Sequence, residues 1–300
     1  MQIHGLRHVL GAVLAIAMVL PVCAKDGSDS PSQEPCGGFR IAPEYHFDED
    51  VHFFFNQKDS TFKRLYFVEW NTFAELAFFS IDNRFFFFFD MQAAIDLGRW
   101  PDKAILFDPN QVDIGFGPTF EYRFNRLNVA LGLDHHCFHQ IDTLVTAPDF
   151  GPMYWNKLML SVSSPQFRPE AFREAIGHGA ELTWDRRIAW QAGIAYTLHD
   201  FFGMDTSIVG WNQVYMIDLT GEARCAAFRF KGFAAILDGK TGAYFTRTNQ
   251  TLWNQQLRAE LLATEGKFGL DLFVNWVVVD QLQKRLNKDR LVAIGIDGFR

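Results

Sequence analysis

The sequence predicts an all-β protein, a transmembrane antiparallel β-barrel, from three observations. Apolar and polar residues alternate with a period of two along many segments, as they do in strands with one apolar and one polar face. Several segments exceed the about 5 to 6 residues of an ordinary strand and reach the about 9 to 11 that cross a bilayer at a tilt. The 300 residues also include 32 Phe and 8 Trp, more aromatic side chains than the surface of a soluble protein usually carries.

Residues 1–24 are predicted to be a cleaved secretory signal peptide. They combine a basic start at Arg7, an apolar run from Val9 to Leu20 and the small residue Ala24 before a charged pair. The apolar run is shorter than the ~20 residues of a membrane-spanning helix. Residues 25–38 are rich in Ser, Pro, Gly and charge and are expected to form a flexible leader. The predicted barrel therefore occupies residues 39–300.

The alternation is clearest from Phe85 to Leu97 and from Val112 to Phe124. It returns near residues 188–198, 215–225, 257–263, 268–278 and 291–299, which brings the count to about 12 strands, with even totals from 10 to 14 compatible. Tyr154–Ser163 and Glu170–Trp184 both have strand character. Accepting both as full spans gives an odd total, so either one of the two is partial or the segment Phe39 to Lys63 supplies an unexpected number of strands.

Short periplasmic turns and long outer loops should alternate in such a barrel. Turn residues predict tight links at 82–83, 125–126, 185–187, 226–227 and 264–267. Longer polar stretches predict outer loops at 99–111, 140–153, 200–212, 239–250 and 280–289. The last predicted strand ends at Phe299, one residue before the terminus, as in the C-terminal segment of outer-membrane barrels.

Charge and cysteine content narrow the remaining choices. A net charge of −7 makes nucleic acid an unexpected partner. After signal cleavage Cys36, Cys137 and Cys225 remain, an odd number, so at least one thiol is unpaired or pairs between chains. Inward residues of both signs are expected to pair with one another rather than to form an open selective ring. A barrel of this strand count excludes a wide pore, and a narrow solvated pore remains an alternative. The inward charged residues are Asp90, Asp96, Glu121, Arg123, Glu222, Arg224, Lys231, Arg258, Glu260 and Asp271. A secreted β-sandwich is the alternative fold, but its strands would be shorter.

The segment from Leu127 to Leu160 carries the candidate chemistry. Its alternation places His135 and Cys137 on the same outward face as Leu131 and Leu133, and Asn156 on the outward face of the next strand. A base, a thiol and an amide would then meet at the outer rim of the bilayer.

Gly132-Leu133-Asp134-His135-His136-Cys137, followed by Trp155-Asn156-Lys157-Leu158, resembles the active-site region of outer-membrane phospholipase A. The resemblance implies a 12-stranded bacterial outer-membrane barrel that hydrolyses the acyl esters of membrane phospholipids. By position, His135 matches the general base, Cys137 the nucleophile and Asn156 the residue that orients the imidazole. Cys137 stands where the family has Ser, and the loop before Asn156 is longer here.

The same resemblance implies calcium as a cofactor and a homodimer. The family's calcium ligands have no residue-by-residue match in this sequence, so the metal ligands are unknown. Asp142 is the only carboxylate near Cys137 in the following loop before Asp149.

Three interpretations of this segment remain open. A thiol performs acyl transfer when a base removes its proton, although apolar surroundings raise the pKa of a thiol. Alternatively, His135, Cys137 and His139 would bind zinc or copper, since all three share one strand face. In the third interpretation the histidines lie at the membrane interface, and the protein is a non-enzymatic barrel: a narrow channel, a structural or surface protein, or an inactive relative of the phospholipase.

Overall fold

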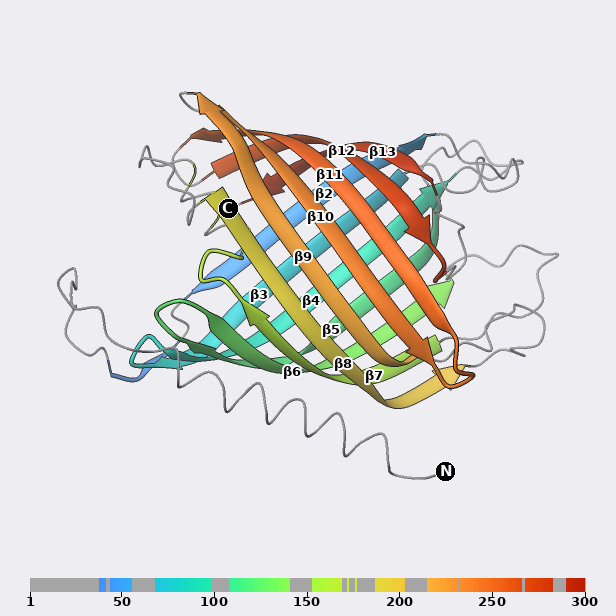
Figure 1. Ribbon diagram of the computed structural model, residues 1–300, viewed down its shortest axis with the longest axis horizontal. Coiled ribbons are helices and arrows are strands. Elements are labelled where there is room, and N and C mark those ends of the chain that lie inside the picture. Colours follow the sequence, from blue (N-terminus) through green and yellow to red (C-terminus); the bar gives the residue numbers. More distant parts are fainter. Residues whose placement is uncertain are drawn as a thin grey trace. The chain divides into compact units, whose positions relative to one another are not determined.

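The structure is a computed structural model. It describes residues 38–41, 44–55, 68–98, 108–140, 153–168, 172, 176, 187–202, 215–230, 233–265, 268–282 and 290–299. All of them belong to one compact unit, residues 37–300, in which the strands close into a barrel (Figure 1). Within these ranges no helix has the length and apolar character needed to cross a membrane.

Twelve long strands form the barrel wall, which confirms the predicted fold class and strand number. Each strand pairs antiparallel with the next, and the last pairs with the first through Val292↔Phe55 to Phe299↔Asp48, which closes the sheet. A two-residue strand, β1 (Arg40–Ile41), adds a short pairing to β3. The wall consists of β2 (Tyr45–Phe55), β3 (Val68–Ile81), β4 (Phe85–Gly98), β5 (Asp108–Arg123), β6 (Asn128–Gln140), β7 (Met153–Ser163), β8 (Ile188–Phe202), β9 (Tyr215–Phe230), β10 (Phe233–Thr246), β11 (Thr251–Glu265), β12 (Phe268–Asp280) and β13 (Val292–Phe299).

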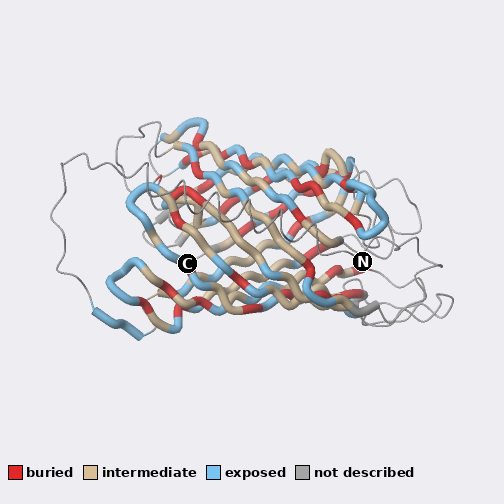
Figure 2. Tube along the Cα trace, turned by 60° about the horizontal axis from the view of Figure 1, so that its bottom comes forward, coloured by how far each residue is buried: buried red, intermediate tan, exposed pale blue. Residues whose placement is uncertain are grey.

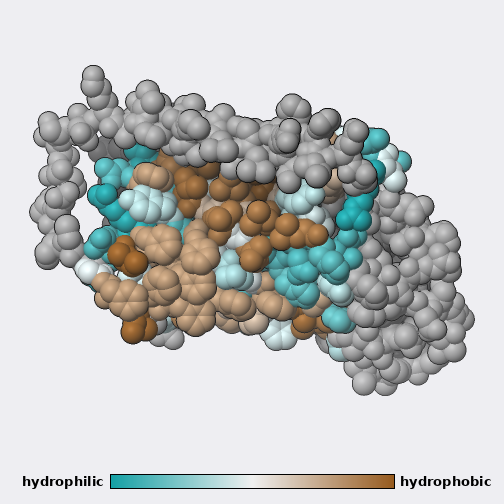
Figure 3. Space-filling view, turned by 90° about the horizontal axis from the view of Figure 1, so that it is seen from below, coloured by the Kyte–Doolittle hydropathy of each residue, from teal (hydrophilic) through white to brown (hydrophobic). Residues whose placement is uncertain are grey.

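Side chains on the outer face of the wall are apolar and exposed, whereas many polar side chains face inward and are buried. Leu131 and Leu133 on β6 are each 47% exposed, while Asp271 on β12 is fully buried. Exposed and buried positions alternate along the strands (Figure 2). Figure 3 shows a band of apolar side chains between hydrophilic margins. This inverted distribution places the apolar face against lipid, and the protein is an outer-membrane β-barrel.

Phenylalanine is abundant because several outward strand ends carry stacked rings. Ring centroids lie 5.7 Å apart for Phe78 and Phe87, 5.4 Å for Phe79 and Phe87, and 4.8 Å for Phe87 and Phe120. These residues lie close to the turns at 82–84 and 124–127. Aromatic girdles of this kind mark the edge of the apolar band at a membrane interface.

Both ends of the barrel wall, Tyr45 and Phe299, lie at the same end of the barrel as the short turns 82–84, 124–127, 231–232 and 266–267. Short turns mark the periplasmic end. The connections between β2 and β3, β4 and β5, β6 and β7, β8 and β9, and β12 and β13 lie at the other, outer end.

Two predicted connections after residue 200 are wrong. The link at 226–227 does not exist, because β9 continues to Phe230 with a register shift near Ala226. The loop at 239–250 is instead strand to Thr246, followed by a turn in which Asn249 has a φ of 61°. Its polar residues were misassigned because they line the bore, where Lys240 pairs with Glu222.

The ambiguity between two candidate strands is resolved in favour of Tyr154–Ser163, which lies in β7. Within Glu170–Trp184 the structure describes Phe172 and Ile176, and neither belongs to a strand. The amide of Phe172 bonds instead to the Arg168 carbonyl, 2.9 Å away, as in a helical turn. Both side chains pack inside the bore with alanines and aliphatic residues of the wall, which explains their apolar character. The predicted tight link at 185–187 is also wrong, since these residues end a long connection.

Candidate active site on the outer surface

The pairing of β6 with β7 places His135 directly opposite Asn156. The Nδ1 of His135 lies 2.7 Å from the Oδ1 of Asn156. A carboxamide oxygen only accepts hydrogen bonds, so Nδ1 carries the proton and donates it. The lone pair of Nε2 is then left to act as a base, and Asn156 fixes both the tautomer and the orientation of the ring.

Cys137 lies two residues beyond His135 on the same strand and opposite Tyr154 on β7. It is a free, half-buried thiol. Alternate residues of a strand are about 6.6 Å apart, so the thiol and the imidazole share one face at adjacent outward positions. Among the described residues, no hydrogen bond joins the two. The structure therefore brings His135 and Asn156 into contact and leaves Cys137 as their neighbour.

The His135 ring is part of a row of rings that extends over four consecutive strands, β5 to β8. The centroid of the His135 ring lies 4.9 Å from that of Phe116 on β5 and 5.7 Å from that of Tyr154 on β7. Tyr154 in turn stacks on His199 of β8, with 5.7 Å between centroids. The imidazole is therefore held by a directional hydrogen bond and by aromatic contacts.

The sequence patterns did not identify Tyr154 or His199 as part of this surface. A strict alternation that starts at Ile188 predicts that His199 points inward, with Gln191 and Thr197, and the structure shows that this prediction is wrong. A bulge in β8 leaves Leu198 without a partner, since Asn156 pairs with His199 and Lys157 with Thr197. One extra residue reverses the facing of the residues beyond it in the strand. Tyr154 lies two residues before Asn156, so both face outward on the same strand. This spacing was the one signal in the sequence that would have identified Tyr154.

The neighbouring residues of both motifs point into the barrel and support the site from behind. His136 forms an ion pair with Asp113 on β5 and stacks on Trp155 of β7, with centroids 4.5 Å apart. Lys157 reaches past β8 to pair with Asp218 on β9. Of the Trp155-Asn156-Lys157 run, only Asn156 is thus presented to lipid.

The donor set of a metal site is not found in the part of the chain that the structure describes. There, no group of three or more His, Cys, Asp or Glu side chains is placed to hold an ion. His139 lies on the outward face opposite Val112, and it does not converge with His135 and Cys137 on a common point. Asp142 and Asp149 lie outside the described residues.

Several of the inward charges form ion pairs, as predicted, with residues of the same strand or of a nearby strand. Arg123 contacts Glu121, Arg224 contacts Glu222 and Asp238, and Arg258 contacts Glu260 and Asp297. Lys231 lies outside the described residues. The pairing leaves space, since cavities of about 570 and 510 Å³ remain inside the wall.

No protein-family model matches the sequence, and no curated protein matches it significantly. Solved structures similar to the chain include the outer-membrane phospholipase dimer of Salmonella typhi with bound calcium, at 10% identity, 86% of this chain, 91% of that chain and a TM-score of 0.47. Outer-membrane phospholipase A of Escherichia coli is 10% identical over 86% of this chain and 97% of that one, with a TM-score of 0.46. The translocator domain of the autotransporter NalP from Neisseria meningitidis is 6% identical over 97% and 94%, with a TM-score of 0.38.

Proposed function

We propose that this barrel hydrolyses acyl esters of phospholipids at its lipid-facing surface, with Cys137 as nucleophile, His135 as base and Asn156 as the positioning residue. The observation that carries the proposal is the 2.7 Å hydrogen bond from His135 to Asn156 on the outward face. An imidazole held in one tautomer, beside a thiol, is the arrangement that nucleophilic catalysis requires.

The proposed reaction has two steps. Nε2 of His135 takes the proton from the Cys137 thiol, and the thiolate attacks the ester carbonyl to give a tetrahedral intermediate. Collapse of the intermediate forms a thioester, and His135 returns the proton to the departing lysophospholipid oxygen. Water, deprotonated by the same nitrogen, then cleaves the thioester to release the fatty acid and restore the thiol. No step is assigned to calcium, because the described side chains supply no ligand group for it.

A second candidate function is that of a non-enzymatic barrel. The observation that favours it is the absence, within the described residues, of a hydrogen bond between Cys137 and His135. Catalytic hydrogen bonds are often long before substrate binds, so an enzyme without substrate can lack this hydrogen bond as well. The two candidates are separated by an activity measurement.

The decisive variant is Cys137→Ala, assayed by fatty-acid release from phospholipid in detergent micelles. We expect the wild-type protein to release fatty acid and Cys137→Ala to fall to background, because no thiolate can attack the ester. Cys137→Ser should retain part of the activity. Cys225→Ala is the matched control, since Cys225 is a second free, partly buried thiol on another strand of the wall, and we expect it to match wild type.

The assay is run with calcium and with chelator, and the monomer-to-dimer ratio is measured in each arm. Phospholipids are the expected partners, and a homodimer is the expected assembly if activity follows the dimer fraction. Lack of hydrolysis by refolded wild-type protein in every arm would leave the non-enzymatic barrel as the function. Equal activity of Cys137→Ala and wild type would remove Cys137 from the proposal.

A further inference from the structure

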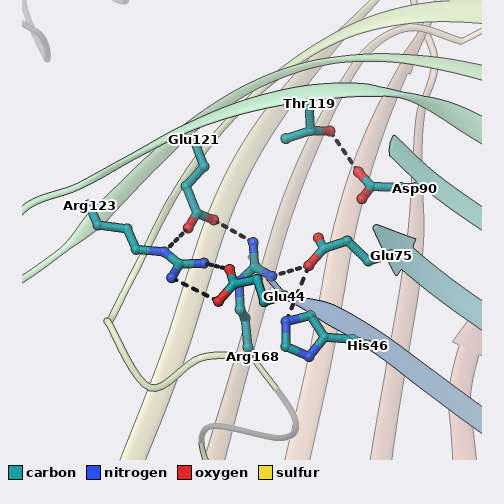
Figure 4. A network of polar contacts seen from close by, with 8 residues as sticks. All are labelled: Glu44, His46, Glu75, Asp90, Thr119, Glu121, Arg123 and Arg168. Atoms are coloured by element: carbon teal, nitrogen blue, oxygen red, sulfur yellow. Dashed lines mark hydrogen bonds and ion pairs between the residues drawn. The ribbon is translucent and has the colours of Figure 1, made fainter. Parts of the chain in front are cut away.

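Part of the connection between β7 and β8 lies inside the barrel, anchored by Arg168. This side chain forms ion pairs with Glu75 of β3 and Glu121 of β5, the second at 3.0 Å (Figure 4). Its guanidinium carbon also lies 4.1 Å from the centroid of the Phe88 ring on β4. Three adjacent strands therefore hold one cation that belongs to the connection.

The same connection is fixed on the opposite wall. The carbonyl oxygen of Phe167 accepts a hydrogen bond from Arg224 of β9 at 3.2 Å, and that of Ile176 accepts one from Arg229 at 2.7 Å. Phe172 and Ile176 are 1% and 0% exposed in an apolar cluster with residues of β8 to β11: Ala189, Ala226, Ala234, Ile236 and Leu262. Because β10 lies six strands from β4 in the order of the sheet, halfway around the barrel, these residues cross the bore. We call Ser164 to Arg168, with Phe172 and Ile176, the inner strap.

The inner strap lies toward the periplasmic end. It leaves β7 at Ser163, whose strand partner Asn128 is the first residue of β6 after the turn at 124–127. The amide of Ser164 also bonds to the Trp190 carbonyl near the start of β8, 2.9 Å away. The strap therefore lies near the end at which the short turns lie.

Beyond the strap the bore is hollow and acidic. The cavities of about 570 and 510 Å³ share Phe73, Gln92 and His136 in their linings, so they adjoin each other. Phe172 lines the first, and Leu282, which follows β12 at the outer end, lines the second. Seven carboxylates face three Lys or Arg side chains in the first cavity, and three face one in the second. Such a lining concentrates cations and repels anions.

We propose that the inner strap closes the periplasmic end of a cation-conducting lumen, and that release of its Arg168 anchor opens a path through the barrel. Without the guanidinium, Glu75 and Glu121 lose the cation that lies between them: Glu121 keeps Arg123, while Glu75 is left beside His46 at 3.6 Å. Hydration of these buried carboxylates requires that the strap move. The lumen behind it then connects the two ends. This function is independent of the lipid-facing site, which uses none of the same residues.

The experiment is planar-bilayer conductance in potassium chloride with the full-length refolded protein. We expect no discrete conductance steps from the wild-type protein. Arg168→Gln should give such steps, and in a salt gradient the reversal potential of its current should move toward the equilibrium potential of potassium. Phe172→Asp loosens the strap at the opposite wall through an independent contact, and it should give the same conductance. Arg126→Gln, which removes an exposed cation from the periplasmic turn at 124–127, is the control and should stay silent.

Folding of each variant is checked by heat-dependent gel mobility. If Arg168→Gln and Phe172→Asp both fold like wild type and neither conducts, the proposal is overturned, because the strap is then not the element that blocks the bore. Steps of the same size in wild type would overturn it for the same reason. Anion-selective steps would contradict the assignment of the acidic lumen as the path.

Discussion

His135→Ala is expected to lower kcat for phospholipid hydrolysis by about 100-fold to 10,000-fold, the range in which a positioned general base contributes. The imidazole moves the proton at each step of the proposed reaction, whereas it holds no part of the acyl chain. KM should therefore change little. The measurement is steady-state release of fatty acid from a phospholipid of one chain length, over a range of surface concentrations, by equally folded proteins.

Asn156→Ala tests whether the amide acts through the ring. The kcat of Asn156→Ala should fall less than that of His135→Ala, because the imidazole remains but is free to rotate and to exchange tautomers. The double variant should be no slower than His135→Ala alone, since a positioning residue has nothing to position once the base is gone. His199→Ala is the control: it removes a ring from the same outward row without touching the hydrogen bond. If the kcat of His199→Ala fell as far as that of His135→Ala, catalysis would depend on the row of aromatic rings rather than on the His135–Asn156 hydrogen bond.

The sequence predicted the barrel because a period of two is a local property that each strand carries by itself. The count of about 12 strands was less firmly set, because an even number with both wall ends on the same side also allows 10 or 14. The turn assignments near residues 226 and 239–250 failed because small and polar residues that line a bore resemble turn residues in the sequence. Ala226 is buried against the strap, and Lys240 pairs with Glu222 on the neighbouring strand β9. Neither environment is visible without the partner strand.

The candidate site was predictable only in part, for a related reason. His135 and Cys137 are two residues apart, so their common face follows from the strand alone. Their relation to Asn156 depends on the register of β6 and β7, which alternation limits but does not set. His199 was misplaced because one bulged residue in β8 reverses its facing. Glu170–Trp184 has strand character in the sequence because Phe172 and Ile176 are apolar, yet these two side chains are buried in the bore rather than in contact with lipid.

Gly117→Ala is expected to lower the free energy of unfolding by about 1–3 kcal/mol, the usual cost of an extra methyl group in a packed interior. A methyl group on Gly117 would coincide with the carbonyl oxygen of Leu133 on β6, and backbone cannot rotate away as a side chain can. The regular pairing of β5 and β6 is interrupted at this point, between Phe116↔His135 and Thr119↔Gly132. Gly117 therefore permits a close approach of the two strands beside the site.

The same substitution should lower hydrolytic activity more than its loss of stability explains. Leu133 precedes His135 by two residues, so a shift of its carbonyl carries the imidazole away from the 2.7 Å bond to Asn156. Urea unfolding in micelles gives the stability, and kcat under fully folded conditions gives the effect on the site. Gly239→Ala is the matched control, because its methyl group would meet Leu257 Cδ2 at an ordinary 3.5 Å. Wild-type kcat in a destabilised Gly117→Ala would show that the position of β6 at Leu133 does not set the position of His135.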